Sequence, residues 1–205
     1  MRGLLRTALV VALLVWATLP AAADAAKKKK AKGPGAVDVT MPVNAPIPDA
    51  VPANGPNGLL TSTIDVGKPF KGKRIRDVNV TVQTTGLTGT VPSNDLIGYL
   101  TAPNGATTGL FSRLGLIGSG FSIGPLVLDD ESPIGLGFGD EGDPTSLESP
   151  WVGTARPDEP GLYVLDDGPV KGAWTLRVLD TFAGETSQFN FWRLQIAAGR
   201  PYRTK

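Results

Sequence analysis

The chain has 205 residues, with 20 Lys plus Arg against 19 Asp plus Glu, and it contains neither His nor Cys. This length is enough for one domain with a proper core. The missing residue types exclude a Ser-His-Asp triad, a Cys-His dyad, a His- or Cys-ligated zinc site and any disulfide. The 26 Gly and 18 Pro favour strands joined by tight turns over helices.

The N-terminus has the pattern of a Sec-type signal peptide. Two arginines precede an apolar run over residues 8–19, and small residues follow it. The run is shorter than the ~20 apolar residues that a membrane span requires. We therefore expect residues 1–23 to be a signal peptide, cleaved after Ala23 or Ala26. The mature chain is then expected to be secreted and to have no transmembrane span.

Residues 24–57 read as a disordered linker or arm. Lys27 to Lys30 and Lys32 form a basic run, and six prolines follow without an apolar period. The basic run is either a solvated tether or a contact for anionic wall polymers or lipid head groups.

From residue 58 onward the pattern changes to short apolar runs separated by turn residues. The clearest strand is 77–83, where three valines alternate with four polar residues. A long acidic loop containing Trp151 covers 140–159. In chain order, strands are expected at 61–66, 77–83, 95–101, 110–111, 126–128, 134–138, 162–165, 172–180 and 189–196.

The last two of these strands each begin their apolar face with a tryptophan, Trp174 or Trp192, and continue with period 2. A short polar loop joins them, so we expect a hairpin with both tryptophans in the core. About eight or nine short strands within ~140 residues predict an all-β fold, an antiparallel β-sandwich of jelly-roll type. The predicted domain covers 58–199 and is followed by a basic tail at 200–205.

Charge is unevenly distributed along the chain. Residues 58–199 hold ten basic and 16 acidic side chains, a net charge of −6, between basic ends. An acidic domain without interleaved aromatic and basic residues argues against a nucleic-acid partner.

The terminal pattern resembles a known family. Gly172-x-Trp174-x-Leu176-x-Val178-x-Asp180, followed by Phe189-x-x-Trp192-x-Leu194-x-Ile196, is similar to the closing signature of the P domain, also called the P/Homo B domain. That domain follows the catalytic domain of subtilisin-like proprotein convertases and kexins. Four further segments resemble the family in the same order along the chain: 77–83, 95–105, 128–131 and 162–172.

The chain also departs from the family pattern. Gln83-Thr84 stands where many members have His-Thr before the Asp-Leu strand. The last turn has Glu185 and Ser187 in place of the usual Asp and Gly. These differences concern loops and leave the sandwich strands unchanged.

The resemblance implies a non-catalytic module, because the family domain stabilises or regulates a subtilisin-like serine endopeptidase. Only the signal peptide and an arm of 34 residues precede the domain, so a stand-alone P domain is expected. Its partner would be a separately encoded secreted protease or another extracellular protein. The chain is not expected to be an enzyme, since it has no histidine to act as general base.

Acidic residues in the second half suggest a structural Ca²⁺ site, because Ca²⁺ prefers six to eight oxygen ligands. The predicted ligands are Asp129, Asp130, Glu131 and Asp180. The alternative is that these are turn residues, since Asp favours turns and local hydrogen bonds to the backbone.

Trp151, in the Pro-rich acidic loop, is a possible exposed anchor for a ligand or partner. It carries the alternative function, an extracellular carbohydrate- or wall-polysaccharide-binding jelly-roll module. No pair of carboxylates stands at a separation that the sequence defines, so glycoside hydrolysis has no specific support. No Ser-x-x-Lys motif is present either.

Overall fold

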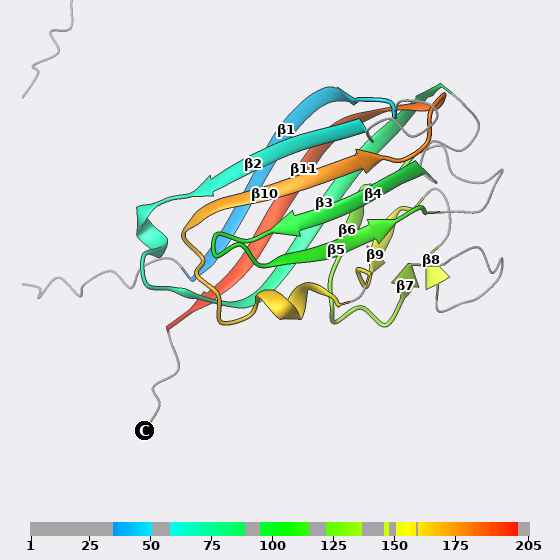
Figure 1. Cartoon of the computed structure of the whole chain (residues 1–205). Coiled ribbons are helices and arrows are strands. Elements are labelled where there is room, and N and C mark those ends of the chain that lie inside the picture. The colour runs from blue at the N-terminus through cyan, green and yellow to red at the C-terminus, as the bar shows by residue number, and fades with distance from the viewer. Residues whose placement is uncertain are drawn as a thin grey trace, which may run out of the picture. The chain divides into compact units, whose positions relative to one another are not determined.

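The computed structural model describes residues 35–50, 58–88, 95–114, 122–136, 146–147, 151–158 and 160–200. The predicted signal peptide, the lysine run and the last five residues lie outside these ranges. The strands (Figure 1) are β1 (Ala36–Ile47), β2 (Gly58–Val66), β3 (Arg74–Thr88), β4 (Leu96–Thr101), β5 (Thr107–Ser112), β6 (Leu126–Leu128), β7 (Gly135–Leu136), β8 (Ser146–Leu147), β9 (Gly153–Ala155), β10 (Gly172–Asp180) and β11 (Thr186–Gly199). Two 3-10 turns are η1 (Lys68–Phe70) and η3 (Leu162–Leu165).

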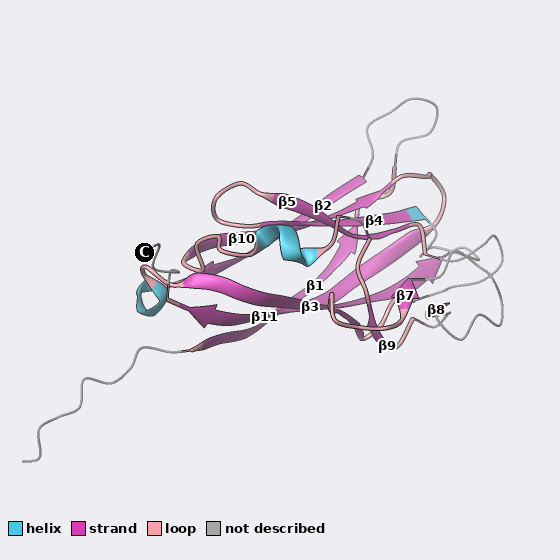
Figure 2. Cartoon of the chain, turned by 90° about the horizontal axis from the view of Figure 1, so that it is seen from below, coloured by secondary structure: helices cyan, strands magenta, loops and turns pink. Residues whose placement is uncertain are grey.

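Nine of these strands form two sheets, of order β1-β11-β3-β6-β9 and β2-β10-β4-β5. Figure 2 shows the sheets as two layers packed face to face. Neighbouring strands within both sheets are antiparallel except the β6–β9 pair. The predicted all-β sandwich of eight or nine strands is therefore confirmed. Within the described residues, no helix has the length and apolarity needed to cross a bilayer.

The core lies between the sheets and is built from the alternating inward positions of their strands. Trp174 and Trp192 are both 0% exposed, as are Leu100 and Phe111. Burying each such side chain contributes about 1.5–3 kcal/mol. The prediction that both tryptophans are core residues is confirmed.

The predicted hairpin of the last two strands is wrong. β10 pairs with β2 and β4, whereas β11 pairs with β1 and β3, so residues 181–185 cross from one sheet to the other. Thr181 fixes the start of this crossing, since its N–H and its Oγ1 both donate to Asp95 O, at 2.9 and 2.8 Å. Period-2 patterns show that each strand has one apolar face, but they do not tell whether two such faces lie in the same sheet or oppose each other.

The predicted linker also contains a strand. β1 pairs with β11 from Ala36 to Ile47, with an irregularity between Pro42 and Ala45. The strand tolerates its prolines because it lies at the edge of the sheet, where one side of the backbone needs no partner. The prolines hid an alternating apolar pattern, so the folded domain begins near residue 35 and not at 58.

Two shorter predictions are corrected as well. Residues 162–165 form η3 and not a strand. Of the strand expected at 134–138, only Gly135–Leu136 is a strand, and residues 137–138 lie outside the described ranges. β9, from Gly153 to Ala155, was not predicted because three residues are too short to show a period.

Candidate functional site

The four predicted calcium ligands do not come together. Asp129–Glu131 follow β6, whereas Asp180 ends β10. Leu128, the last residue of β6, lies level with Leu194 of β11, because both residues pair with Val80 of β3. β11 begins at Thr186, after the loop that follows Asp180, and Leu194 is eight residues farther along the strand. At about 3.3 Å per strand residue, the end of β6 and the start of β11 are roughly 26 Å apart. One ion cannot bind all four residues.

Two of these carboxylates have structural partners instead. Asp129 Oδ1 accepts a hydrogen bond from Glu131 N at 2.9 Å, and Asp130 Oδ1 accepts one from Leu162 N at 2.9 Å. These contacts support the interpretation of the acidic residues as turn residues. Within the described ranges, no group of three or more acidic side chains is arranged to hold a metal ion. Calcium binding by this chain stays a prediction.

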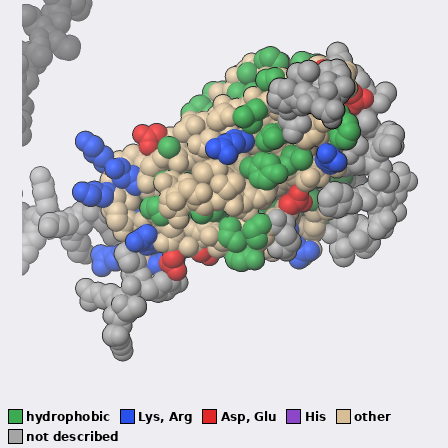
Figure 3. Space-filling view, in the orientation of Figure 1, with side chains coloured by type: hydrophobic (Ala, Val, Ile, Leu, Met, Phe, Trp, Pro, Cys, Tyr) green, Lys and Arg blue, Asp and Glu red, His purple; other side chains and the backbone are tan. Residues whose placement is uncertain are grey.

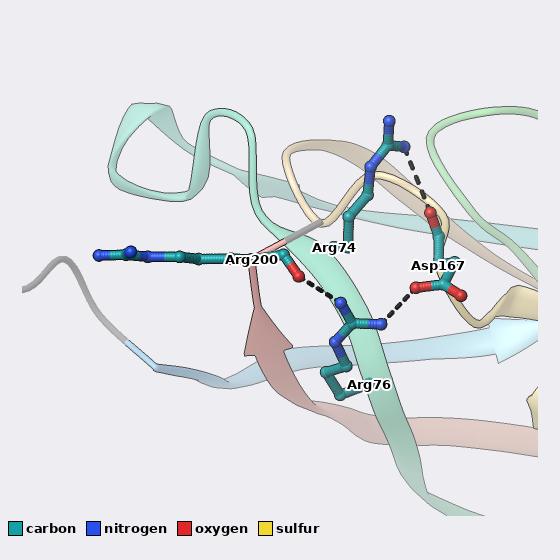
Figure 4. A network of polar contacts seen from close by, with 4 residues as sticks. All are labelled: Arg74, Arg76, Asp167 and Arg200. Atoms are coloured by element: carbon teal, nitrogen blue, oxygen red, sulfur yellow. Dashed lines mark hydrogen bonds and ion pairs between the residues drawn. The ribbon is translucent and has the colours of Figure 1, made fainter. Parts of the chain in front are cut away.

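A first acidic group surrounds the start of β3. Burial raises the pKa of Asp77, and the charges of Asp129 and Asp130 raise it further. Burial also raises the pKa of Asp166, with added repulsion from Asp77. Asp167 of the same turn forms an ion pair with Arg76 (Figure 4). The group is therefore partly neutralised by an arginine.

A second acidic group, the acidic end, consists of Asp49, Asp95, Asp180 and Glu185. Asp180 is 1% exposed, and burial raises its pKa to about 7, with repulsion from Asp95 and Asp49 acting in the same direction. Burial likewise raises the pKa of Asp95 to about 6, and the charge of Glu185 adds to this.

The acidic end holds the β10–β11 loop through backbone hydrogen bonds. Asp180 Oδ1 accepts from Phe182 N at 3.1 Å, and both carboxylate oxygens of Asp49 lie 3.1 Å from Gly184 N. Each carboxylate thus satisfies a loop N–H group that would otherwise need water. This arrangement braces a connection between the two sheets.

Trp151 is not an exposed anchor. Its side chain is 2% exposed and belongs to the hydrophobic core, and Trp151 lies two residues before the start of β9. Its Nε1 is buried without a hydrogen-bond partner. Because an indole ring is large and mainly apolar, it packs inward even from a Pro-rich segment. The prediction of an exposed ligand anchor is wrong, and the carbohydrate-binding alternative loses the aromatic surface on which it depended.

A pocket that sequence reasoning missed lies on the outer side of β4 and β5. It has a volume of about 380 Å³. Asp158 N donates to Leu110 O at 3.2 Å, which holds the segment after Arg156 against β5. Ile97 and Tyr99 occupy the outward positions of β4, where a half-buried strand usually has polar residues. The residues that line it include Ile97, Tyr99, Thr107, Ser112, Asp158 and Pro160.

Asp158 gives this pocket its electrostatic character. Burial raises the pKa of its carboxyl group, and no ion pair to it exists among the described residues. Thr108 Oγ1 donates to Gly161 O at 2.7 Å and fixes the backbone just beyond it. The pocket combines an aromatic and aliphatic wall with one carboxyl group, which suits a basic or hydrogen-bonding side chain better than an acidic one.

No protein-family model matches the sequence. No curated protein matches it either. In structure, the chain is similar to a serine protease of Aeromonas sobria in a complex with the chaperone ORF2, with a TM-score of 0.44 and 14% sequence identity over 82% of this chain and 28% of that chain. A second crystal structure of that serine protease gives a TM-score of 0.43 and 15% identity, with the same shares of each chain.

The chain therefore spans 28% of the length of the solved chains that it matches. The described residues form one sandwich, with no separate catalytic domain beside it.

Proposed function

We propose that this chain is a non-catalytic accessory module of the P/Homo B type that binds and stabilises a serine protease. One observation carries the proposal: four of the sequence segments that resemble the family, 77–83, 95–101, 172–180 and 189–196, fall on interior strands of the two sheets. β10 lies between β2 and β4, and β11 lies between β1 and β3. The two segments of the closing signature, 172–180 and 189–196, thus coincide with strands that carry the buried Trp174 and Trp192. Action outside the cytoplasm, expected from the signal peptide, is part of the proposal.

The contact surface proposed for the protease is the pocket on β4 and β5. Asp158 there is partly desolvated, and a basic side chain of the partner would supply its counter-charge. Tyr99 offers an aromatic face for the stem of the same side chain. An apolar wall beside one carboxyl group is the usual composition of a contact that gives both affinity and orientation.

The proposal is tested with secreted subtilisin-type proteases that lack a sandwich domain of their own. The full chain, immobilised, is expected to retain such a protease, and Tyr99→Ala is expected to weaken the binding at least about tenfold, as for an aromatic interface anchor. Thr61→Ala, on the outer face of β2 in the same sheet, is the matched control and should bind like the unmodified chain. Failure of the unmodified chain to retain the protease would refute the proposal, and equal binding by both variants would refute the pocket as the contact.

A further inference from the structure

The outer face of the sheet β2-β10-β4-β5 carries apolar side chains at positions that face away from the core. Leu179 lies opposite Ile97 in the β10–β4 register, and both side chains are only half-buried. Tyr99, two residues after Ile97 on the same strand, adds an aromatic ring. Figure 3 views this face and shows hydrophobic side chains among the polar ones. Because outward positions of a sheet in water are ordinarily polar, this face has the composition of a contact surface.

The outer face of the other sheet is different. Its outward positions include Asn79 of β3 and Arg193 and Gln195 of β11. The guanidinium group of Arg193 pairs with the carboxylate of Asp38 at 2.6 Å. That face is polar, and its arginine already has a partner within the chain.

Two charged side chains of opposite sign flank Tyr99 on the apolar face. On one side, Arg177 of β10 lies directly opposite Tyr99 in the register. On the other side, Tyr99 pairs with Gly109 of β5, and Asp158 N donates to the carbonyl oxygen of the next residue, Leu110, at 3.2 Å. The order across the sheet is therefore cation, aromatic ring and carboxyl group, at one level along the strands.

Neither charge is compensated within the part of the chain that the structure describes; Glu159 lies outside it. Arg177 is exposed and forms no ion pair with any described residue. Burial raises the pKa of Asp158 without a contribution from a described cation, so neither Arg156 nor Arg177 of the same copy compensates it. At about 4.8 Å per strand spacing, β10 and the segment of Asp158 are roughly 14 Å apart, which is too far for a direct ion pair. Both charges are therefore left to solvent or to a second molecule.

Two further charges near this face lie away from that level. Asp65, near the end of β2, is offset from Arg177 by four residues along the strands, roughly 13 Å. The Arg113 guanidinium lies 4.9 Å from the centre of the Phe182 ring, beside the acidic end. Neither changes the order of charges across β10, β4 and β5.

This order is self-complementary. A two-fold axis parallel to the strands, placed between β4 and β5, turns the face over onto a second copy and reverses the order of the charges. Arg177 of each copy then lies opposite Asp158 of the other copy, and Ile97 and Tyr99 are covered near the axis. Because both pairs form at once, the contact closes at two copies. The pocket that Asp158 lines, with a volume of about 380 Å³, has room for an arginine side chain.

We propose that the chain forms a two-fold dimer through this face, in which Arg177 of each copy enters the Asp158 pocket of the other. The planar guanidinium group suits this place, since it pairs with a carboxylate and packs on an aromatic ring such as that of Tyr99. The dimer covers the surface proposed for the protease, so self-association and protease binding exclude each other. This last consequence rests on the proposed function, whereas the dimer itself does not.

Sedimentation equilibrium of the full chain alone, at concentrations from about 1 to about 300 µM, tests the dimer without any protease. We expect the mass to rise from that of one chain to that of two. Arg177→Glu and Asp158→Arg each place like charges opposite one another, so each variant alone should dimerise at least about tenfold more weakly. Lys71→Glu makes the same change of charge at an exposed position in the turn after η1 (Figure 1) and should dimerise like the unmodified chain.

An equimolar mixture of Arg177→Glu and Asp158→Arg gives the sharpest result. In a mixed dimer the two carboxylates of one copy face the two guanidinium groups of the other, so the mixture should dimerise although each variant alone does not. A chain that stays monomeric throughout the range would overturn the proposal, and so would single variants that dimerise like the unmodified chain. A mixture that stays monomeric, while circular dichroism and unfolding show both variants folded, would overturn it as well. Failure to retain a protease would refute the proposed function and leave the dimer standing.

Discussion

Trp192 Nε1 donates a hydrogen bond to Ser62 Oγ at 2.9 Å and so joins the two sheets of the sandwich. Trp192 belongs to β11 of one sheet and is 0% exposed, whereas Ser62 belongs to β2 of the other. A tryptophan that the sequence places in the core therefore also determines how the sheets are aligned. The bond satisfies the indole N–H, which would otherwise be buried without a partner.

Replacing Ser62 by Ala tests this link. The substitution removes the acceptor and leaves the indole N–H unsatisfied, so we expect the free energy of unfolding to fall by about 1–2 kcal/mol. Urea unfolding, followed by tryptophan fluorescence, measures it. Thr61→Ala, at the exposed neighbouring position, should change stability by less than about 0.5 kcal/mol. Equal effects of the two substitutions would contradict the assigned role of Ser62.

The acidic end predicts a specific pH dependence of stability. Asp95 and Asp180 have folded-state pKa values raised to about 6 and about 7. A raised carboxyl pKa means that the folded protein holds the proton more tightly than the unfolded chain does. The contribution to stability is therefore fully present below about pH 4, the ordinary pKa of Asp, and is lost as pH rises through 6 and 7. We expect a higher urea midpoint at pH 5 than at pH 8.

Asp180→Asn isolates this effect, since an amide keeps the acceptor for Phe182 N and does not ionise. The stability of the variant should therefore fall much less between pH 5 and pH 8 than that of the unmodified chain. If the unmodified chain instead grew steadily more stable over this range, and the variant behaved identically, the proposed titration of the acidic end would be wrong.

The close packing of β4 against β5 gives a prediction for Gly98. A methyl group at this position would lie 2.4 Å from a ring carbon of Phe111, which is 0% exposed and has no room to move. Gly98→Ala is expected to destabilise the fold by about 1–3 kcal/mol through overpacking. Gly67→Ala is the control, because its nearest contact would be Pro69 Cδ at 3.8 Å. Thermal unfolding of both variants measures the difference, and a Gly98→Ala protein as stable as the control would contradict the packing.

Asp130 tests the choice between a turn residue and a calcium ligand. Asp130→Ala deprives Leu162 N of its acceptor, so we expect a loss of about 1–2 kcal/mol. Since this role needs no metal, the loss should be the same in calcium and in EDTA. A loss that appears only in calcium would show that Asp130 binds the ion, because a bound ligand adds stability through linkage.

The sequence predicted the fold class because its strands have strong alternation. In β10 every second side chain from Trp174 is buried, and residues 126–128 form β6 with the predicted bounds. The same local pattern says nothing about pairing, so it could not place β10 and β11 in different sheets. Pairing depends on which surfaces pack together over long separations in sequence.

The site was less predictable because its residues meet only through the fold. Asp49 and Asp180 are 131 positions apart in the sequence and come close only in the fold. Asp49 also lies within residues 24–57, which were expected to be a linker. The prediction that Trp151 is exposed was wrong because it relied on the Pro-rich, acidic sequence around this residue, which is typical of exposed loops. The outward Ile97 and Tyr99 were the available signal for the pocket, since these positions in a half-buried strand are ordinarily polar.

The most direct test of the central claim, that the chain is a non-catalytic partner of a serine protease, is the thermal unfolding of that protease with and without the chain. A secreted subtilisin-type protease without a sandwich domain of its own is inactivated with an active-site reagent and mixed with an equimolar amount of the full chain. Binding to the folded protease is expected to raise its Tm by several degrees, while the chain alone hydrolyses no peptide substrate. An unchanged Tm at concentrations up to about 100 µM, or peptidase activity of the chain that survives removal of contaminating proteases, would contradict it.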